Sequence, residues 1–327
     1  MKQENSPEEN AISARSVLLQ TAAQPGNALS FDLEDWYQVL YFEGHISRDE
    51  WFTQESRLQA ITSKLLDILD EHKTRATFFV LGWNAERMPH LVEEIHSRGH
   101  EIASHGFAHQ LIYRQSPEAF AHDLSRSLLI LRSITGQPVK GYRAPSFSIT
   151  RESAWAFSIL MDHGVEYDSS VLPARRPYCG IPDAPRGPWL LCRNDGRCLT
   201  ELPPSTFSML GRNFPFSGGG YFRLLPYWVV HRGLCLTNRA GLPGVVYLHP
   251  WELDPDHPVL QIRWSHRFQH YVNLRHTEKK LKRLLTDFQF VPMAEIHASV
   301  SSTEVVKING ANNVQDFREM GQGTIES

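Results

Sequence analysis

Short apolar segments alternate with amphipathic segments through the first half of this chain, and this alternation restricts the folds that it can adopt. Apolar residues at helical spacing predict helices, and the short apolar runs between them predict buried strands. The predicted strands lie at residues 27–32, 76–81, 99–103, 139–145 and 165–168. The predicted helices lie at residues 57–72, 89–98, 116–135 and 150–163. Such alternation predicts a parallel sheet of the α/β class, and its length suits a barrel or part of one.

The alternation stops between residues 171 and 241, where proline, glycine, arginine and aromatic residues dominate. Residues 218–220 are consecutive glycines, but no strand and lysine of a phosphate-binding loop accompany them. We therefore expect an irregular segment that is structural or lines a substrate. A strand at residues 244–248 and a basic amphipathic helix at residues 277–288 follow.

The two ends of the chain are polar. We expect a flexible N-terminal arm at residues 1–26, one domain at residues 27–297, and a polar tail at residues 298–327. The start lacks the basic residues and apolar run of a secretory signal. We therefore expect a cytoplasmic protein.

The overall composition excludes several classes of partner. The chain has 327 residues, 41% of them hydrophobic, and a net charge of −3. This length supports a substantial core. The small net charge gives no indication of a nucleic-acid partner or of an anionic membrane surface. No segment approaches the ~18 consecutive apolar residues of a membrane-spanning helix.

The four cysteines are Cys179, Cys192, Cys198 and Cys235. Cys192 and Cys198 flank a polar turn, and their spacing does not match a Cys-x-x-Cys zinc site. We expect all four to be ordinary thiols.

Two histidines, His105 and His109, lie four residues apart after the predicted strand at residues 99–103. On a helical turn this spacing places both imidazoles on one face, where they can bind one ion. A catalytic divalent ion usually takes three protein ligands and keeps one position open for water. A third ligand, such as a carboxylate, must come from elsewhere. With 16 histidines in the chain, the pair could also arise by chance.

Three carboxylates, Asp32, Glu34 and Asp35, follow the first predicted strand. Like charges this close are costly unless a cation neutralises them. The alternative is a solvated acidic loop, but aromatic residues flank the carboxylates on both sides. Asp32 and His105 both lie near predicted strand ends, where folds of this class gather their chemistry.

Five ordered motifs between residues 28 and 295 resemble the polysaccharide deacetylase family, carbohydrate esterase family 4, whose core is the NodB homology domain. They lie at residues 30–35, 104–109, 141–145, 168–170 and 246–250. The resemblance implies a distorted, incomplete (β/α) barrel with an irregular insertion and a C-terminal extension. The first motif and the glycine-rich residues 218–223 are also similar to a branch associated with exosortase-type exopolysaccharide gene clusters.

The resemblance implies a metal-dependent hydrolase that removes N-acetyl groups from an amino-sugar polysaccharide, or from its precursor, in exopolysaccharide biosynthesis. Its partner would be an N-acetylated amino-sugar polymer or oligosaccharide. One divalent ion, zinc, would be held by His105, His109 and a carboxylate. Such an ion polarises the acetamide carbonyl and lowers the pKa of bound water from ~15.7 to about 7.

The resemblance also implies roles for four further residues. Asp32 would be the general base and His249 the general acid, a role that suits a side chain with a pKa near working pH. Arg143 would orient Asp32, and Asp168 would support His249.

The identity of the carboxylate ligand stays open between Glu34 and Asp35. The usual family motif has two adjacent aspartates, whereas Leu33 follows Asp32 here. In an extended strand Asp32 and Glu34 point to the same side, which favours Glu34. Asp35 has the side chain usual in the family and could reach the ion if the chain turns after Leu33.

The expected substrate-binding residues are Pro145, Ser146, Tyr221 and Phe222. Aromatic faces with a few polar groups suit a sugar ring. We expect the aromatic residues of segment 171–241 to line the cleft beside the metal, and the alternative is that they only cap the barrel. The predicted wall consists of Tyr178, Phe207, Phe214, Phe216, Tyr221 and Phe222.

Two other functions are compatible with the same motifs. One is an amidohydrolase that acts on a small cyclic or linear amide, which would need a closed pocket in place of an open groove. The other is a carbohydrate-binding protein without catalysis. A binding protein would have no need for the acid–base pair Asp32 and His249, which counts against the second alternative.

Overall fold

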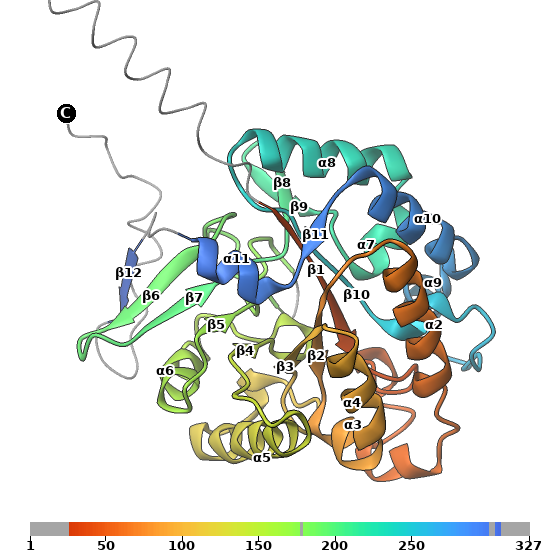
Figure 1. Ribbon diagram of the computed structural model, residues 1–327, viewed down its shortest axis with the longest axis horizontal. Helices are drawn as coiled ribbons and strands as arrows, with labels where there is room; N and C mark the ends of the chain where they lie inside the picture. Colours follow the sequence, from red (N-terminus) through yellow and green to blue (C-terminus); the bar gives the residue numbers. More distant parts are fainter. Residues whose placement is uncertain (1–25, 177–178, 301–304, 309–327) are drawn as a thin grey trace, which may run out of the picture.

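The computed structural model describes residues 26–176, 179–300 and 305–308 (Figure 1). Nearly all of the predicted N-terminal arm, most of the predicted tail, and Tyr178 lie outside the described residues.

A ten-stranded sheet organises the fold. Strands β1 to β5 are neighbours in chain order and pair in parallel, and β10 pairs in parallel with the other edge of β1. The sheet curls without closing, as a half-barrel (Figure 1), which confirms the predicted incomplete barrel. These strands are β1 (Asn27–Leu33), β2 (Thr77–Val80), β3 (Glu101–Ser104), β4 (Gly141–Tyr142), β5 (Tyr167–Asp168) and β10 (Val245–Leu248), and the short β11 (Phe290–Val291) also pairs with β1.

Helices follow the strands, as the alternation predicts. The helix α5 (Pro117–Thr135) shows how local sequence sets its ends. The Ser116 hydroxyl accepts a hydrogen bond from the amide of Ala119, and Gly136 adopts a left-handed conformation that ends the helix. The remaining predicted helices are α2 (Leu58–Glu71), α4 (Pro89–Ser97), α6 (Trp155–Asp162) and α10 (Leu274–Asp287). Two shorter helices, α3 (Gly82–Arg87) and α11 (Met293–Ser299), were not predicted.

Short 3-10 helices occupy several connections. They are η1 (Leu40–Phe42), η2 (Arg48–Thr53), η3 (Ile112–Arg114), η4 (Pro145–Phe147) and η5 (Pro250–Leu253). Among the described residues, no helix combines the length and apolar character needed to cross a membrane.

Segment 171–241 is more regular than the sequence predicts. An antiparallel hairpin of β6 (Trp189–Arg193) and β7 (Cys198–Glu201) continues the sheet beyond β5, and β12 (Val305–Ile308) pairs in parallel with β6. The hairpin of β8 (Thr206–Met209) and β9 (Arg212–Pro215) forms a separate sheet. Two helices, α7 (Gly219–Leu224) and α8 (Tyr227–Arg239), complete the segment. The prediction of an irregular segment was therefore wrong for most of it.

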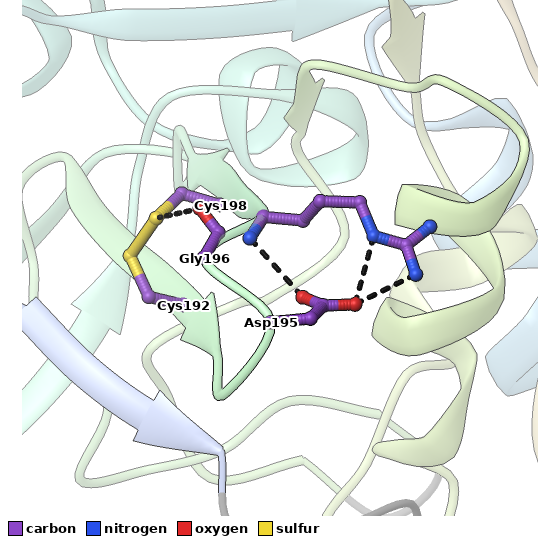
Figure 2. The surroundings of a disulfide bond; sticks show 5 residues. Cys192, Asp195, Gly196 and Cys198 are labelled. Carbon is purple, nitrogen blue, oxygen red and sulfur yellow. Dashed lines mark hydrogen bonds and ion pairs between the residues drawn. A yellow bond between two sulfur atoms is a disulfide. The ribbon is translucent and has the colours of Figure 1, made fainter.

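A disulfide joins Cys192 and Cys198 at the turn of the β6–β7 hairpin (Figure 2). The two cysteines are opposite each other in the antiparallel register, and their Cα atoms are 4.1 Å apart. The prediction of ordinary thiols was wrong for this pair, because the hairpin brings residues six positions apart into direct opposition. Such bonds form mainly in oxidising compartments, so the cytoplasmic location remains a prediction that this disulfide does not favour.

Candidate active site

Six of the predicted site residues meet at the carboxyl ends of the parallel strands. They lie at or just after the ends of β1, β3, β4 and β10, which stand in the sheet order β10-β1-β2-β3-β4. Parallel strands present their carboxyl ends at one edge, so residues far apart in sequence converge there. The residues are Asp32, Glu34, His105, His109, Arg143 and His249.

The loop after β3 brings His105 and His109 together without a helical turn. Asp123 of α5 accepts hydrogen bonds from the amides of Phe107 (2.7 Å) and Ala108 (3.2 Å). Gly106 has a φ of 74°, and a Cβ there would lie 2.9 Å from the Asp123 carboxylate. The expected helical turn was therefore wrong, although the imidazoles converge, with ring centroids 5.5 Å apart.

Glu34 completes a set of three buried ligand groups. Its Oε1 lies 2.8 Å from His105 Nε2 and 3.0 Å from His109 Nε2. His105 donates its Nδ1 proton to the carbonyl of Arg143 at 2.7 Å, which leaves Nε2 free to bind an ion. Tetrahedral zinc ligands at ~2.0–2.1 Å from the ion lie about 3.4 Å apart. The three groups therefore fit a divalent metal in donor type and number, and their ligand atoms would have to separate by about 0.5 Å to bind it.

The charge state of Glu34 also suits a metal site. Burial raises the pKa of this carboxyl, but the neighbouring His109 and His105 oppose that effect and hold the pKa well below its usual value. Glu34 is therefore ionised at neutral pH and available as an anionic ligand.

Asp35 points away from the two histidines, so its prediction as a metal ligand was wrong. Its carboxylate accepts hydrogen bonds from the Ser56 hydroxyl (2.6 Å) and from the amides of Trp36 (2.9 Å) and Arg57 (3.1 Å). Burial raises the pKa of Asp35. This residue anchors the segment before α2 and leaves the ligand position to Glu34.

Arg143 holds Asp32 in place, as predicted. Arg143 is fully buried and donates from Nη1 to Asp32 Oδ1 at 2.6 Å. Its other donors reach the hydroxyl of Ser30 and the hydroxyl and carbonyl of Ser169. A guanidinium with this many partners has one available orientation. The second oxygen of Asp32 lies 3.8 Å from His249 Nε2.

His249 is supported by Glu252 and not by Asp168. His249 donates from Nδ1 to Glu252 Oε1 at 2.7 Å, and the other oxygen of Glu252 accepts from Arg223 Nε at 2.5 Å. Burial alone lowers the pKa of His249, but the hydrogen bond with Glu252 and the charges of Glu34, Glu252 and Asp32 raise it to about 9. His249 is therefore protonated at neutral pH, with Nε2 directed toward Asp32.

Asp168 forms a separate buried pair with Glu201 of β7. It accepts a hydrogen bond from the Ser170 hydroxyl at 2.5 Å, and Asp168 and Glu201 are both fully buried. Burial raises the pKa of both carboxyls, and the negative charge of Asp168 raises that of Glu201 further. The predicted contact of Asp168 with His249 was wrong because β7 continues the sheet beyond β5 and gives Asp168 a different partner.

Some of the predicted substrate-binding residues lie in the core, and others lie at the surface. Phe222 and Phe216 are fully buried in the main apolar core, so their prediction as parts of a substrate wall was wrong. Tyr221 remains partly exposed beside Arg176, whose guanidinium lies 4.4 Å from the ring centre. Pro145 is buried, and Ser146 is partly exposed with a φ of 53° in the turn after Arg143.

The other predicted wall residues are not gathered at the metal ligands. Phe207 and Phe214 stack on each other within the β8–β9 hairpin, with ring centroids 5.6 Å apart. The glycines at 218–220 have a packing role, since a Cβ on Gly218 would lie 2.2 Å from the ring of Tyr247. Packing contacts therefore account for Phe207, Phe214, Phe216 and Phe222, and the choice between wall and cap stays open for Tyr221.

Sequence reasoning gave no role to Glu252 and Arg223. The spacing His249-Pro250-Trp251-Glu252 is the signal that could have found the first, because Glu252 returns to the amide and imidazole of His249 as in a capping box. Arg223 lies in a different helix, and no local pattern links it to Glu252.

Comparison with known proteins gives two adjoining family matches. Residues 49–167 match the family model described as polysaccharide deacetylase. Residues 169–298 match the model described as domain of unknown function (DUF3473). The second match covers β6 to α10 and therefore includes His249, Glu252 and Arg223.

Several curated relatives match shorter stretches. A peptidoglycan-N-acetylglucosamine deacetylase of Bacillus cereus is 34% identical over 84 residues, 26% of this chain and 30% of the relative. A peptidoglycan deacetylase of Helicobacter pylori is 30% identical over 112 residues, 33% of this chain and 36% of the relative. A chitooligosaccharide deacetylase of Bradyrhizobium sp. is 28% identical over 97 residues, 30% of this chain and 44% of the relative. The chain thus spans less than half the length of these relatives.

A solved structure shares the fold over nearly the whole chain. It is the crystal structure of a Mycobacterium smegmatis protein assigned to the polysaccharide deacetylases, with a TM-score of 0.59 at 21% identity. The match covers 88% of this chain and 96% of that protein.

Proposed function

Because residues 49–167 match the family model described as polysaccharide deacetylase, we propose that this chain removes N-acetyl groups from a polymer containing N-acetylglucosamine. The similarity to peptidoglycan and chitooligosaccharide deacetylases supports this substrate class. The motif resemblance to exosortase-associated proteins supports a role in exopolysaccharide biosynthesis.

The single observation that carries the proposal is the convergence of two groups of residues. Glu34, His105 and His109 provide a three-ligand set, and Asp32 and His249 form an acid–base pair beside it, 3.8 Å apart. Amide hydrolysis requires this combination, because water must lose a proton and the leaving amine must gain one.

The proposed cofactor is one Zn²⁺ held by Glu34, His105 and His109. When bound, such an ion polarises the acetamide carbonyl and makes water a nucleophile at neutral pH. Three protein ligands leave one coordination position open for substrate or water.

The chain's own residues handle the protons. Asp32 accepts a proton from the attacking water, and Arg143 fixes the carboxylate for this role. His249 donates its Nε2 proton to the amine nitrogen as the C–N bond breaks, and acetate and a free amino group result. Glu252 keeps His249 protonated and oriented, and Arg223 keeps Glu252 in place.

Metal analysis combined with acetate release from N-acetylglucosamine oligomers tests the proposal. We expect about one zinc per chain in the parent, acetate release by the metal-loaded protein, and loss of both in His105→Ala. His90→Ala, a change at a mainly exposed histidine of α4, is the matched control and keeps both. Stoichiometric zinc in His105→Ala would exclude this ligand set, and absence of acetate release by the zinc-loaded parent would exclude the activity.

A further inference from the structure

Helix α9 (Trp264–Tyr271) exposes aromatic side chains to an unusual degree. Trp264 is 81% exposed and Phe268 is 51% exposed. The two residues are four apart, so they share one face of the helix. His270 is the buried residue of this helix. Neighbouring exposed aromatic side chains of this size commonly mark a binding surface.

The stretch of chain that contains α9 carries charges of one sign only. Residues 257–277 contain no aspartate and no glutamate. Arg263 and Arg267 are exposed at the start and in the middle of the helix, and neither forms an ion pair within the described part of the chain. Arginine side chains without a carboxylate partner can bind an anionic ligand in the bidentate manner typical of guanidinium groups.

Two ring stacks connect α9 to the proton donor. The His270 ring lies 4.2 Å from Trp251, and the Trp251 ring lies 5.3 Å from His249, both in stacked orientation. Arg223, which binds Glu252, also donates to the carbonyls of Gln269 and His270. The helix is therefore held in a fixed position next to the site, beside α7 and α10 (Figure 1).

The aromatic surface continues from α9 toward the predicted substrate residue Tyr221. Tyr41 is 40% exposed, and its ring centroid lies 4.9 Å from that of His266 in α9. Burial raises the pKa of Tyr41, and the nearby charge of Arg176 opposes this effect. Arg176 in turn contacts the ring of Tyr221. Aromatic and cationic groups thus follow one another from α9 through Tyr41 and Arg176 to Tyr221.

We propose that α9 and Tyr41 form a platform that binds an acidic glycan strand and leads it to the active site. This inference rests on the proposed function and narrows its substrate class to polymers that carry carboxylates beside N-acetylated sugars. Aromatic faces pack against sugar rings, and the arginines bind the carboxylates. The carboxylates could belong to uronic acids or to the lactyl groups of muramic acid.

Binding of three hexasaccharides to the full chain, measured by calorimetry, tests this platform. The first contains only N-acetylglucosamine, the second alternates it with glucuronic acid, and the third alternates it with N-acetylmuramic acid. We expect tighter binding of at least one acidic probe than of the neutral one, and the preferred probe identifies the source of the carboxylate. Arg263→Gln/Arg267→Gln should weaken that probe about tenfold at low salt and leave the neutral probe unchanged. Trp264→Ala should weaken all bound probes by a similar factor.

The helix α8 provides matched controls. Trp228 is 67% exposed and Arg232 is exposed, but neither belongs to the ring stacks around His249. Trp228→Ala and Arg232→Gln should bind every probe as the parent does.

Three results would overturn the platform. They are equal binding of neutral and acidic probes, parental binding by the α9 variants, and an effect of those variants only on co-sedimentation with phosphatidylglycerol vesicles. The last would make α9 a membrane-contacting surface. Because binding needs no turnover, failure of the platform is distinguishable from failure of the proposed function, which acetate release from the neutral hexasaccharide tests separately.

Discussion

Replacing Glu252 by glutamine tests how the chain keeps its proton donor charged. Glutamine retains the shape of the side chain, and its carbonyl oxygen can still accept the 2.7 Å hydrogen bond from His249 Nδ1. The substitution therefore removes a buried negative charge and keeps the contact with His249, but the glutamine NH2 group cannot accept the hydrogen bond that Arg223 Nε gives to Glu252 Oε2. Arg223 keeps its bonds to the carbonyls of α9 and Val272.

The expected magnitude follows from the surroundings of His249. Its pKa is about 9 against an ordinary value of 6.5. At about 1.4 kcal/mol per pKa unit, this difference corresponds to roughly 3 kcal/mol in favour of the imidazolium. One opposite charge in contact accounts for about 1–3 pKa units. We therefore expect the alkaline limb of the kcat/KM profile to move down by about 1–3 pH units in Glu252→Gln.

The free energy of unfolding should also decrease in Glu252→Gln. Because the folded-state pKa of His249 is raised, protonation contributes stability that is fully present below pH 6.5 and is lost as the pH rises through about 9. Glu252→Gln should therefore be less stable than the parent at pH 6, and the part of this difference that comes from His249 should vanish above pH 9.

The assay is acetate release from N-acetylglucosamine oligomers between pH 6 and 10, with metal content measured for each variant. A bound divalent cation offsets the charge of Glu34, so the limb of the parent lies at or below pH 9. The difference in the position of the alkaline limb between the parent and Glu252→Gln depends much less on the bound cation. Asp168→Asn is the informative comparison, because it should leave the alkaline limb in place even if the overall rate falls. An unchanged limb in folded, metal-loaded Glu252→Gln would refute the role of Glu252, and a shifted limb in Asp168→Asn would return that role to Asp168.

Three further predictions follow from the same contacts. Asp32→Asn should keep its metal and lose about 10²–10⁴-fold in kcat, and near-parental turnover would exclude this residue as the base. Asp168→Asn should reduce the loss of stability that the parent shows as the pH rises from about 4 to 6. This loss of roughly 3 kcal/mol arises because burial raises the pKa of Asp168 from 3.8 to about 6, so that the native state binds more protons than the unfolded chain in this range. Identical pH dependence of urea unfolding in the parent and the variant would contradict it. Phe222→Ala should cost about 3–5 kcal/mol in free energy of unfolding because it empties a core position, whereas Tyr221→Ala should retain stability and raise KM. Urea unfolding and Michaelis constants separate the two, and a parental KM in Tyr221→Ala would assign this residue to capping.

The amino-acid sequence by itself determined the class of fold and most of the site. Alternating apolar and amphipathic segments are local patterns, and they favour parallel strands joined by helices. Because parallel strands end at a common edge, residues placed after several of them converge in any such fold. Asp32, His105, Arg143 and His249 could therefore be selected before their contacts were known.

Only the tertiary structure decided which of two neighbouring side chains faces the site. Glu34 and Asp35 are adjacent and chemically alike, but Ser56 and the amide of Arg57 hold Asp35 away from the histidines. Tyr221 and Phe222 are also adjacent, and the packing of α7 buries the second in the core. A choice of this kind depends on partners far away in the sequence, which no local pattern contains.

Long-range partners were likewise decided by the tertiary structure. Glu252 is three residues from His249, but its fixed charge depends on Arg223, which a separate helix supplies. Asp168 lies at a strand end, as a site residue should, but the pairing of β5 with β7 places Glu201 against it. The physical reason is burial: a charged group removed from water takes the partner that packing brings to it, and packing is a property of the whole fold.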